Sequence, residues 1–364
     1  MDSEAQVLYV SNTPLESSMN PFLLIAAMSL GALQGSVAKA KAIDRTLLPY
    51  EKPGNLVSLR DRRVLHIKCM GTGTPTIVLT AGLGEWSATW RLVQPALAAR
   101  YRTCAWDRPG IGFSSGSYLS QTVAVTTTDL AEGLRTARIP GPFVLVGHSL
   151  GGFETLLFAD RYRSRVVGMV LVDPGIPDQL TRFRRAAPAF EATIEASNAE
   201  RPALLRKCAV WVSRGGNRSA APDPGGCLSF PDDYPPALAK SLAQLDLNAA
   251  RWAANISLSE RFADDTQLVV NPKRNYGNMP LIVLTSSKLP AFTASTPQAT
   301  VRDAPRLLAE LNAAHDELAA LSTRGVNRSV PDSGHYIQIE HPEAVLAAVE
   351  EVASQRPLTS ATAP

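Results

Sequence analysis

Several features are scarce or missing in this chain, and each absence excludes a class of function. The formal net charge of the 364 residues is only +3, and no cluster of Lys and Arg alternates with aromatic residues. Nucleic acid and an anionic membrane surface are therefore poor candidates for partners. No C-x-x-C or H-x-x-x-H spacing occurs, so we expect neither a metal site nor a bound cofactor.

The sequence also lacks an obvious membrane span. The apolar block at residues 21–33 is too short to cross a bilayer stably, but it has the size of a signal-peptide core and small residues follow it. The acidic segment before it is unusual for a secretory signal, and translation from Met19 would remove it. We expect residues 1–45 to be signal-like or disordered and the protein to be periplasmic or secreted. A cytoplasmic protein is the alternative.

Cysteine is rare but even in number, which agrees with an oxidising compartment. Cys208 and Cys227 bracket a segment rich in Gly, Pro, Arg and Ser that has little core of its own. A disulfide closing this segment would stabilise the fold by about 3 kcal/mol. The other two cysteines are Cys69 and Cys104. Buried free thiols are the alternative reading.

Short apolar runs alternate with helical patterns along most of the chain. Helices are predicted at 127–138, directly after residue 150, around 307–321 and at 342–353, and an amphipathic helix around 90–97. Such alternation predicts an α/β fold with a parallel sheet covered by helices on both faces. Strands are predicted at 56–59, 64–70, 76–80, 103–106, 142–146, 166–172, 281–285 and 325–331.

One segment breaks this rhythm. Between residues 175 and 278, helical patterns at 179–197 and 236–247 alternate with Pro/Gly loops, and no convincing strand occurs. We interpret 175–278 as an inserted helical cap. Residues 46–174 and 279–355 are then the two parts of the α/β core, and 356–364 a disordered tail.

The pentapeptide GHSLG at 147–151 stands between a predicted strand and a predicted helix. This context is typical of a nucleophile elbow, where small neighbours permit strained backbone at the serine. Ser149 is the predicted nucleophile. The N–H of Leu150, at the helix N-terminus, would face a developing oxyanion. A glycine-rich packing turn is the alternative.

A nucleophilic serine needs a base. His335 follows the last predicted strand on a loop late in the chain. Folds with a nucleophile elbow carry the general base in this place, in the chain order Ser, Asp, His. The remaining histidines lie in strands, in the elbow or on helices, and we expect them to be structural: His66, His148, His315 and His341.

The acid is harder to assign. The loop after the 281–285 strand has no carboxylate before Asp303, whereas the strand before the cap ends at Asp173. A side chain there lies at the sheet edge where parallel α/β sheets build their sites. We predict that Asp173 orients the imidazole of His335, with Asp303 and then Asp316 or Asp332 as alternatives. A turn-capping role is the other reading of Asp173.

The AGLG loop at 81–84 follows the third strand. Its glycines would let the backbone approach a ligand, so the N–H of Leu83 is the predicted second oxyanion donor. A plain tight turn is the alternative. Residues 107–110 are expected to order a wall of the site, and Asp107 is disfavoured as the acid because it precedes the nucleophile.

Taken in order, these motifs resemble the α/β-hydrolase superfamily over roughly residues 56–353. The segments that carry the resemblance are 147–152, 107–114, and 333–335 followed by 341–343. The resemblance implies an eight-stranded, mostly parallel sheet with a helical cap between the sixth and eighth strands. Its strand order implies that Cys69 lies beside Cys104, which makes a second disulfide plausible.

Two departures from the family pattern stand out. Ala81-Gly82 replaces the usual His-Gly, so the hydrogen bonds that hold this loop must differ. The usual acid after the seventh strand is missing, and Asp173 matches the placement after the sixth strand known in some lipases.

The resemblance implies an esterase- or lipase-like serine hydrolase that acts on a small apolar ester, amide or lactone. The aromatic residues of the cap are consistent with an apolar ligand. The sequence does not indicate an oligomeric state. An acyltransferase or cofactor-free haloperoxidase on the same residues is one alternative, and a binding protein that has lost turnover is another. Ser149 stands where dehalogenases and epoxide hydrolases carry an aspartate, which disfavours both.

Overall fold

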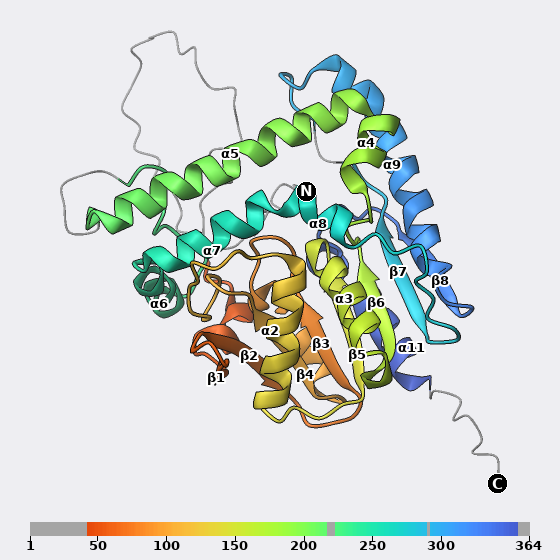
Figure 1. The fold of residues 1–364 in the computed structure, drawn as a ribbon, viewed down its shortest axis with the longest axis horizontal. Coiled ribbons are helices and arrows are strands. Elements are labelled where there is room, and N and C mark those ends of the chain that lie inside the picture. The colour runs from red at the N-terminus through yellow and green to blue at the C-terminus, as the bar shows by residue number, and fades with distance from the viewer. Residues whose placement is uncertain (1–41, 217–222, 290–291, 356–364) are drawn as a thin grey trace.

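The computed structural model describes residues 42–216, 223–289 and 292–355 (Figure 1). Nearly all of the predicted signal-like segment, and the predicted tail at 356–364, lie outside the described residues. Within those three ranges, no helix is both long and apolar enough to cross a membrane.

An eight-stranded sheet forms the centre of the fold, as predicted. The first two neighbouring pairs, β1 with β2 and β2 with β4, are antiparallel, and the remaining neighbours pair in parallel. The strands in spatial order are β1 (Asn55–Ser58), β2 (Val64–Met70), β4 (Thr103–Asp107), β3 (Thr76–Thr80), β5 (Phe143–His148), β6 (Val166–Val172), β7 (Leu281–Ser286) and β8 (Gly325–Val330).

Side chains that alternate along each strand divide the core into two layers. On β5, Phe143 and Leu145 belong to one apolar cluster, and Val144 and Val146 belong to another on the opposite face. The first cluster packs under α2 (Val123–Thr136), α3 (Leu150–Arg161) and α9 (Gln298–Ala319), and the second under α1 (Gln94–Leu97) and α11 (Pro342–Ser354). Helices therefore cover both faces, which confirms the predicted layering (Figure 1).

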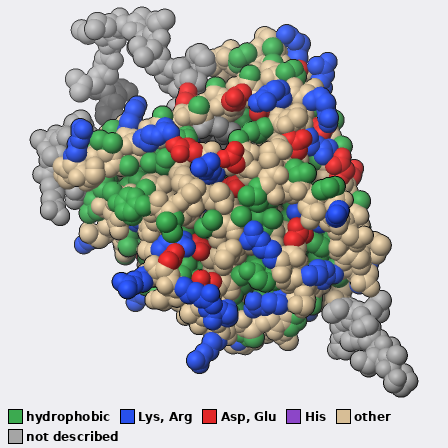
Figure 2. All heavy atoms as spheres, viewed as in Figure 1, with side chains coloured by type: hydrophobic (Ala, Val, Ile, Leu, Met, Phe, Trp, Pro, Cys, Tyr) green, Lys and Arg blue, Asp and Glu red, His purple; other side chains and the backbone are tan. Residues whose placement is uncertain are grey.

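The insertion between β6 and β7 is helical, and its described residues contain no strand. In Figure 1, α5 extends over α7 above the sheet, and on α4 Arg182 pairs with Glu310 and Glu317 of α9. Charged side chains of both signs lie close together over this part of the surface (Figure 2). The cap helices are α4 (Gln179–Ala186), α5 (Pro188–Ser213), α6 (Pro236–Asp246), α7 (Ala249–Glu260) and α8 (Phe262–Leu268).

Two helices differ from the sequence prediction, and proline explains both. The pattern at 179–197 predicted one helix, but the chain leaves helical geometry at Ala187 (φ −145°) because the next residue is Pro188, which starts α5. The pattern at 90–97 gives a 3₁₀ turn, η2 (Ser87–Trp90), and then the short α1, in which Pro95 is near the start. The other short helices are η1 (Arg45–Tyr50), η3 (Arg163–Arg165) and α10 (Ile337–Glu340).

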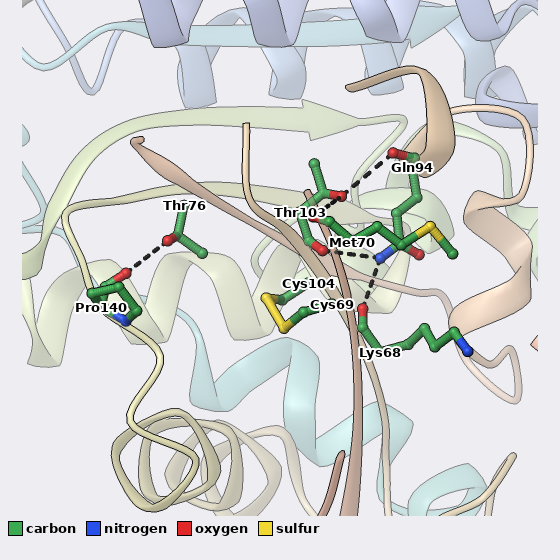
Figure 3. Close-up of a disulfide and its surroundings, with 8 residues drawn as sticks. All are labelled: Lys68, Cys69, Met70, Thr76, Gln94, Thr103, Cys104 and Pro140. Atoms are coloured by element: carbon green, nitrogen blue, oxygen red, sulfur yellow. Dashed lines mark hydrogen bonds between the residues drawn. A yellow bond between two sulfur atoms is a disulfide. The ribbon is translucent and has the colours of Figure 1, made fainter. Parts of the chain in front are cut away.

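Both disulfides that the sequence suggested are present. Cys69 of β2 and Cys104 of β4 are directly opposite in the antiparallel pairing, and their sulfurs are bonded (Figure 3). Cys208 of α5 is bonded to Cys227 in the loop before α6. This second bridge is fully buried in a small apolar cluster with Trp252, so the segment has more core than its composition suggested.

Candidate active site

The turn between β5 and α3 holds Ser149 in strained backbone geometry. Its φ of 51° and ψ of −121° lie in a region that residues other than glycine rarely adopt. A Cβ at Gly151 would lie 2.5 Å from the carbonyl oxygen of Thr80, and one at Gly147 would collide with the backbone of Gly151. The flanking glycines are therefore required for this turn, which places the half-buried serine at the carboxyl edge of the sheet.

Asp173 and His335 are hydrogen-bonded at the same edge. Asp173 directly follows β6 at a φ of 40°, and its Oδ2 lies 2.6 Å from Nδ1 of His335. Its Oδ1 accepts a 2.8 Å hydrogen bond from the N–H of Ser286 at the end of β7. Both carboxylate oxygens are thus engaged, and the orientation of the carboxylate is fixed from two sides.

The electrostatics of the pair favour its charged forms. Burial by itself would raise the pKa of Asp173, but the hydrogen bond and charge of His335, with the Ser286 N–H, outweigh it and hold the pKa below the usual value. For His335, burial acts to lower the pKa. Asp173 and the more distant Glu85 and Glu340 overcome this effect and raise the pKa above the usual value.

The three alternative acids have other partners. Asp303 on α9 accepts a 2.8 Å hydrogen bond from the N–H of Ala189 and so links α9 to the start of α5. Asp316 accepts a hydrogen bond from Asn327, and Asp332 lies 3.8 Å from the ammonium of Lys288. Of the four candidate carboxylates, Asp173 is the one bonded to His335.

The loop after β3 is held by the guanidinium of a buried arginine. The guanidinium of Arg108 donates to the carbonyl oxygens of Ala81 (2.6 Å) and Gly82 (2.8 Å). Arg108 is itself buried against Glu154 of α3, with Nε 2.8 Å from Oε1. The 107–110 segment therefore contributes Arg108 to the support of this loop.

The two predicted oxyanion donors are Leu83, on this loop, and Leu150, at the start of α3. Neither the Leu83 N–H nor the Leu150 N–H donates a backbone hydrogen bond to another described residue. Both groups are thus available to an oxygen atom of a ligand.

Sequence reasoning missed the contribution of Glu85 and assigned His148 only a structural role. Oε2 of Glu85 accepts the Gly82 N–H (2.5 Å) and lies 2.8 Å from Nδ1 of His148. Nε2 of His148 lies 3.0 Å from the backbone oxygen of His335. The available signal was a single carboxylate in an otherwise apolar loop, Ala81 to Trp86.

The other histidines are engaged elsewhere. His66 pairs with Asp107 at 2.6 Å, and His341 lies 3.1 Å from Glu343. His315 is buried, and burial lowers its pKa. Its Nε2 lies 3.0 Å from the carbonyl oxygen of Pro174, so it supports the turn that follows Asp173.

Apolar side chains of the core and the cap pack in one cluster with Leu150, the residue after Ser149. Leu150 and Phe153 of α3 share one apolar cluster with Leu258 of the cap, and Leu83 and Phe262 pack against it. Across the described ranges, no group of three or more His, Cys, Asp or Glu residues could hold a metal ion.

The cap also contributes a cation. Nε of Arg201 on α5 is 3.3 Å from Oγ of Ser259, and among the described residues Arg201 forms no ion pair with a carboxylate. Tyr336, which follows His335, lies within electrostatic range of the guanidinium, and burial lowers the pKa of Arg201 to about 10.

Comparison with known proteins gives partial matches to several curated sequences. A protein of Schizosaccharomyces pombe is 33% identical over 153 residues, which cover 34% of this chain and 28% of that protein. A 2-hydroxy-6-oxo-6-phenylhexa-2,4-dienoate hydrolase of Burkholderia cepacia is 31% identical over 114 residues, 30% of this chain and 40% of that enzyme. The chain thus spans less than half the length of these relatives.

Solved structures extend the similarity across most of the chain. An esterase from Exiguobacterium antarcticum superposes with a TM-score of 0.52 at 15% identity, over 83% of this chain and 100% of that chain. At this identity the likeness concerns the fold alone. The sequence model of the Alpha/beta hydrolase family matches residues 77–348, well over half of the chain. The chain therefore belongs to the Alpha/beta hydrolase family.

Proposed function

We propose that this chain is a serine hydrolase that cleaves carboxylic esters, or amides or lactones, through an acyl-enzyme. The observation that supports this most directly is the His335–Asp173 hydrogen bond at the sheet edge that also carries the strained elbow serine. A hydrophobic packing turn would need neither the strain at Ser149 nor a buried carboxylate oriented toward an imidazole.

In the proposed reaction the Ser149 hydroxyl attacks the ester carbonyl carbon while Nε2 of His335 takes its proton. Asp173 holds the imidazole in the required tautomer and stabilises the imidazolium. The N–H groups of Leu83 and Leu150 stabilise the oxyanion. His335 then protonates the leaving alcohol, and a water molecule activated by His335 releases the acid from the serine.

The proposed substrate is a small, largely apolar ester, because the cluster that contains Leu150, next to Ser149, is apolar and joins side chains of the core and the cap. Arg201 adds a cation of the cap that is near Tyr336 and has no carboxylate partner among the described residues. We therefore expect esters that also carry a carboxylate to be preferred over neutral esters of the same size.

The two disulfides support export, since such bonds persist mainly in oxidising compartments. We propose a periplasmic or secreted protein. An acyltransferase or cofactor-free haloperoxidase would use the same residues and differ in how well the cap excludes water.

Labelling by a fluorophosphonate probe tests the proposal. We expect the folded protein to be labelled at Ser149 and the Ser149→Ala variant to remain unlabelled. An ester panel that varies acyl length and includes carboxylate-bearing members would then define the substrate, with Arg201→Met removing the preference for the carboxylate. Absence of labelling in folded wild-type protein would favour a binding protein that has lost turnover.

A further inference from the structure

A second imidazole–carboxylate pair lies beside the proposed base. His148 and Glu85 come from the elbow and from the loop after β3, and their side chains are 1% and 2% exposed. The ring centroids of His148 and His335 are 4.7 Å apart. The pair therefore lies against the base without contacting solvent.

Hydrogen-bond donors and acceptors limit the protonation states that this pair can adopt. Nε2 of His148 faces the backbone oxygen of His335 at 3.0 Å, and a carbonyl oxygen only accepts, so Nε2 carries a proton. Nδ1 faces Oε2 of Glu85 at 2.8 Å. One proton lies between these two atoms, and it belongs either to the imidazole or to the carboxyl group.

The surroundings of Glu85 favour an ionised carboxylate, with that proton on the histidine. Oε2 already accepts the Gly82 N–H at 2.5 Å, and Oε1 accepts the Thr89 hydroxyl at 3.1 Å. Burial by itself would raise the pKa of Glu85, but His148 and the Gly82 N–H outweigh it and hold the pKa below its usual value. Glu85 thus already accepts two hydrogen bonds, and as an ionised carboxylate it would accept a third from Nδ1 of His148.

We propose that His148 and Glu85 form an imidazolium–carboxylate pair that positions the backbone of His335 and balances charge beneath it. This inference rests on the proposed function. Asp173 orients the imidazole of His335 from one side, and the His148 N–H holds its main chain from the other. His148 and Glu85 are positioning residues, because neither takes part in proton transfer.

Gly82, in the loop after β3, lies so close to the pair that a side chain there would collide with it. A Cβ at Gly82 would lie 2.7 Å from Oε2 of Glu85 and 3.0 Å from Nδ1 of His148. The loop after β3 thus closes directly over the pair, and His148 links this loop to the backbone of His335.

Several other groups act on His335 and must be kept constant in any test. They come from the turn after β6, from the β8–α10 loop, from α10 and from α9: Asp173, Tyr336, Glu340 and His315. None of these is changed in the variants below, so a shift in the titration of His335 reports on the pair.

The decisive variants are His148→Asn and the matched control His66→Asn. Asparagine keeps a donor toward the carboxylate and removes the one at Nε2. In His148→Asn the charge of Glu85 is no longer balanced, so we expect the acid limb of kcat/KM to move up by about 0.5 to 1 pH unit. kcat should fall roughly 10- to 100-fold with KM little changed, because the base is less well placed.

Adding Glu85→Gln to His148→Asn should return the acid limb to the wild-type position while kcat stays low. His66→Asn should leave both unchanged. An unshifted acid limb in an active His148→Asn variant would overturn the pair and leave the serine mechanism intact. Absence of fluorophosphonate labelling in folded wild-type protein would instead overturn the proposed serine mechanism.

Nitrogen NMR of the imidazoles in wild-type protein tests the pair without any enzyme assay, even where a variant fails to fold. At pH 7.5 we expect two protonated ring nitrogens on His148 and one on His66. A single protonated nitrogen on His148 would overturn the proposal.

Discussion

Two buried histidine–carboxylate pairs in this protein have the same chemistry but different surroundings. His66 and Asp107 connect β2 and β4 at 2.6 Å, with side chains 1% and 0% exposed. His148 and Glu85 connect the elbow and the loop after β3 at 2.8 Å, and their side chains are 1% and 2% exposed. Distance and burial alone would therefore assign the two pairs the same role.

The far nitrogen of each ring distinguishes them. Nε2 of His66 accepts a hydrogen bond from the backbone N–H of Gly54 at 2.8 Å, so this nitrogen carries no proton and the ring is neutral. Nε2 of His148 faces a carbonyl oxygen and must donate. The two rings thus differ at Nε2, which accepts a backbone hydrogen bond in His66 and donates one in His148. Here this difference separates a pair that stabilises the sheet from one that supports the base.

In a third pair, His335–Asp173, Nε2 of His335 has no hydrogen-bond partner among the described residues. Breaking this pair should have the largest effect on activity. In Asp173→Asn the amide favours the tautomer protonated on Nε2, which cannot accept the serine proton. We expect kcat to fall by about 10⁴, measured on the ester that the panel selects.

Asp303→Asn is the control for that variant, since Asp303 bonds the start of α5 and not His335. Its kcat should stay close to that of wild type, because Asp303 contacts neither Ser149 nor His335 in the described residues. A large loss in Asp303→Asn together with an active Asp173→Asn would show that the acid is misassigned.

Stability should not distinguish the two buried pairs. His66→Asn and His148→Asn each delete one hydrogen bond at Nε2 and leave a backbone group without its partner. Each should therefore lower the free energy of unfolding by about 1–3 kcal/mol. Urea denaturation of both variants measures this cost. A much larger loss in His66→Asn alone would mean that the His66 pair contributes more to the fold than its hydrogen bonds indicate.

The sequence predicted the sheet well because each buried strand is a short apolar run bounded by turn residues. β6, for example, has the bounds that its apolar run predicted. Helix boundaries were less predictable where proline interrupts the pattern, as at Pro188. The placement of Asp173 next to His335 followed from the general rule that parallel sheets build sites at their carboxyl edge.

The contact of Glu85 with His148 was not visible in the sequence. These residues are 63 positions apart, and they meet because β3 and β5 are adjacent, with Thr80 opposite Gly147 in the register. Local patterns do not report strand order, so a carboxylate after one strand and a histidine after another carried no visible link. Likewise, no local signal indicated that Arg108 would donate to the carbonyl oxygens of Ala81 and Gly82.

The smallest expected effect is a difference between the pH dependence of activity and that of stability. The pKa of His335 is raised above 6.5 in the folded protein. As pH drops through this raised pKa, kcat/KM should fall because the base becomes protonated. The same shift stabilises the fold below pH 6.5, and this contribution is lost as pH rises through the folded pKa. Between these values activity should rise while the contribution of His335 to stability falls. Urea denaturation of wild type and Asp173→Asn across this range isolates that contribution, which should be absent in the variant because the carboxylate that raises the pKa is gone.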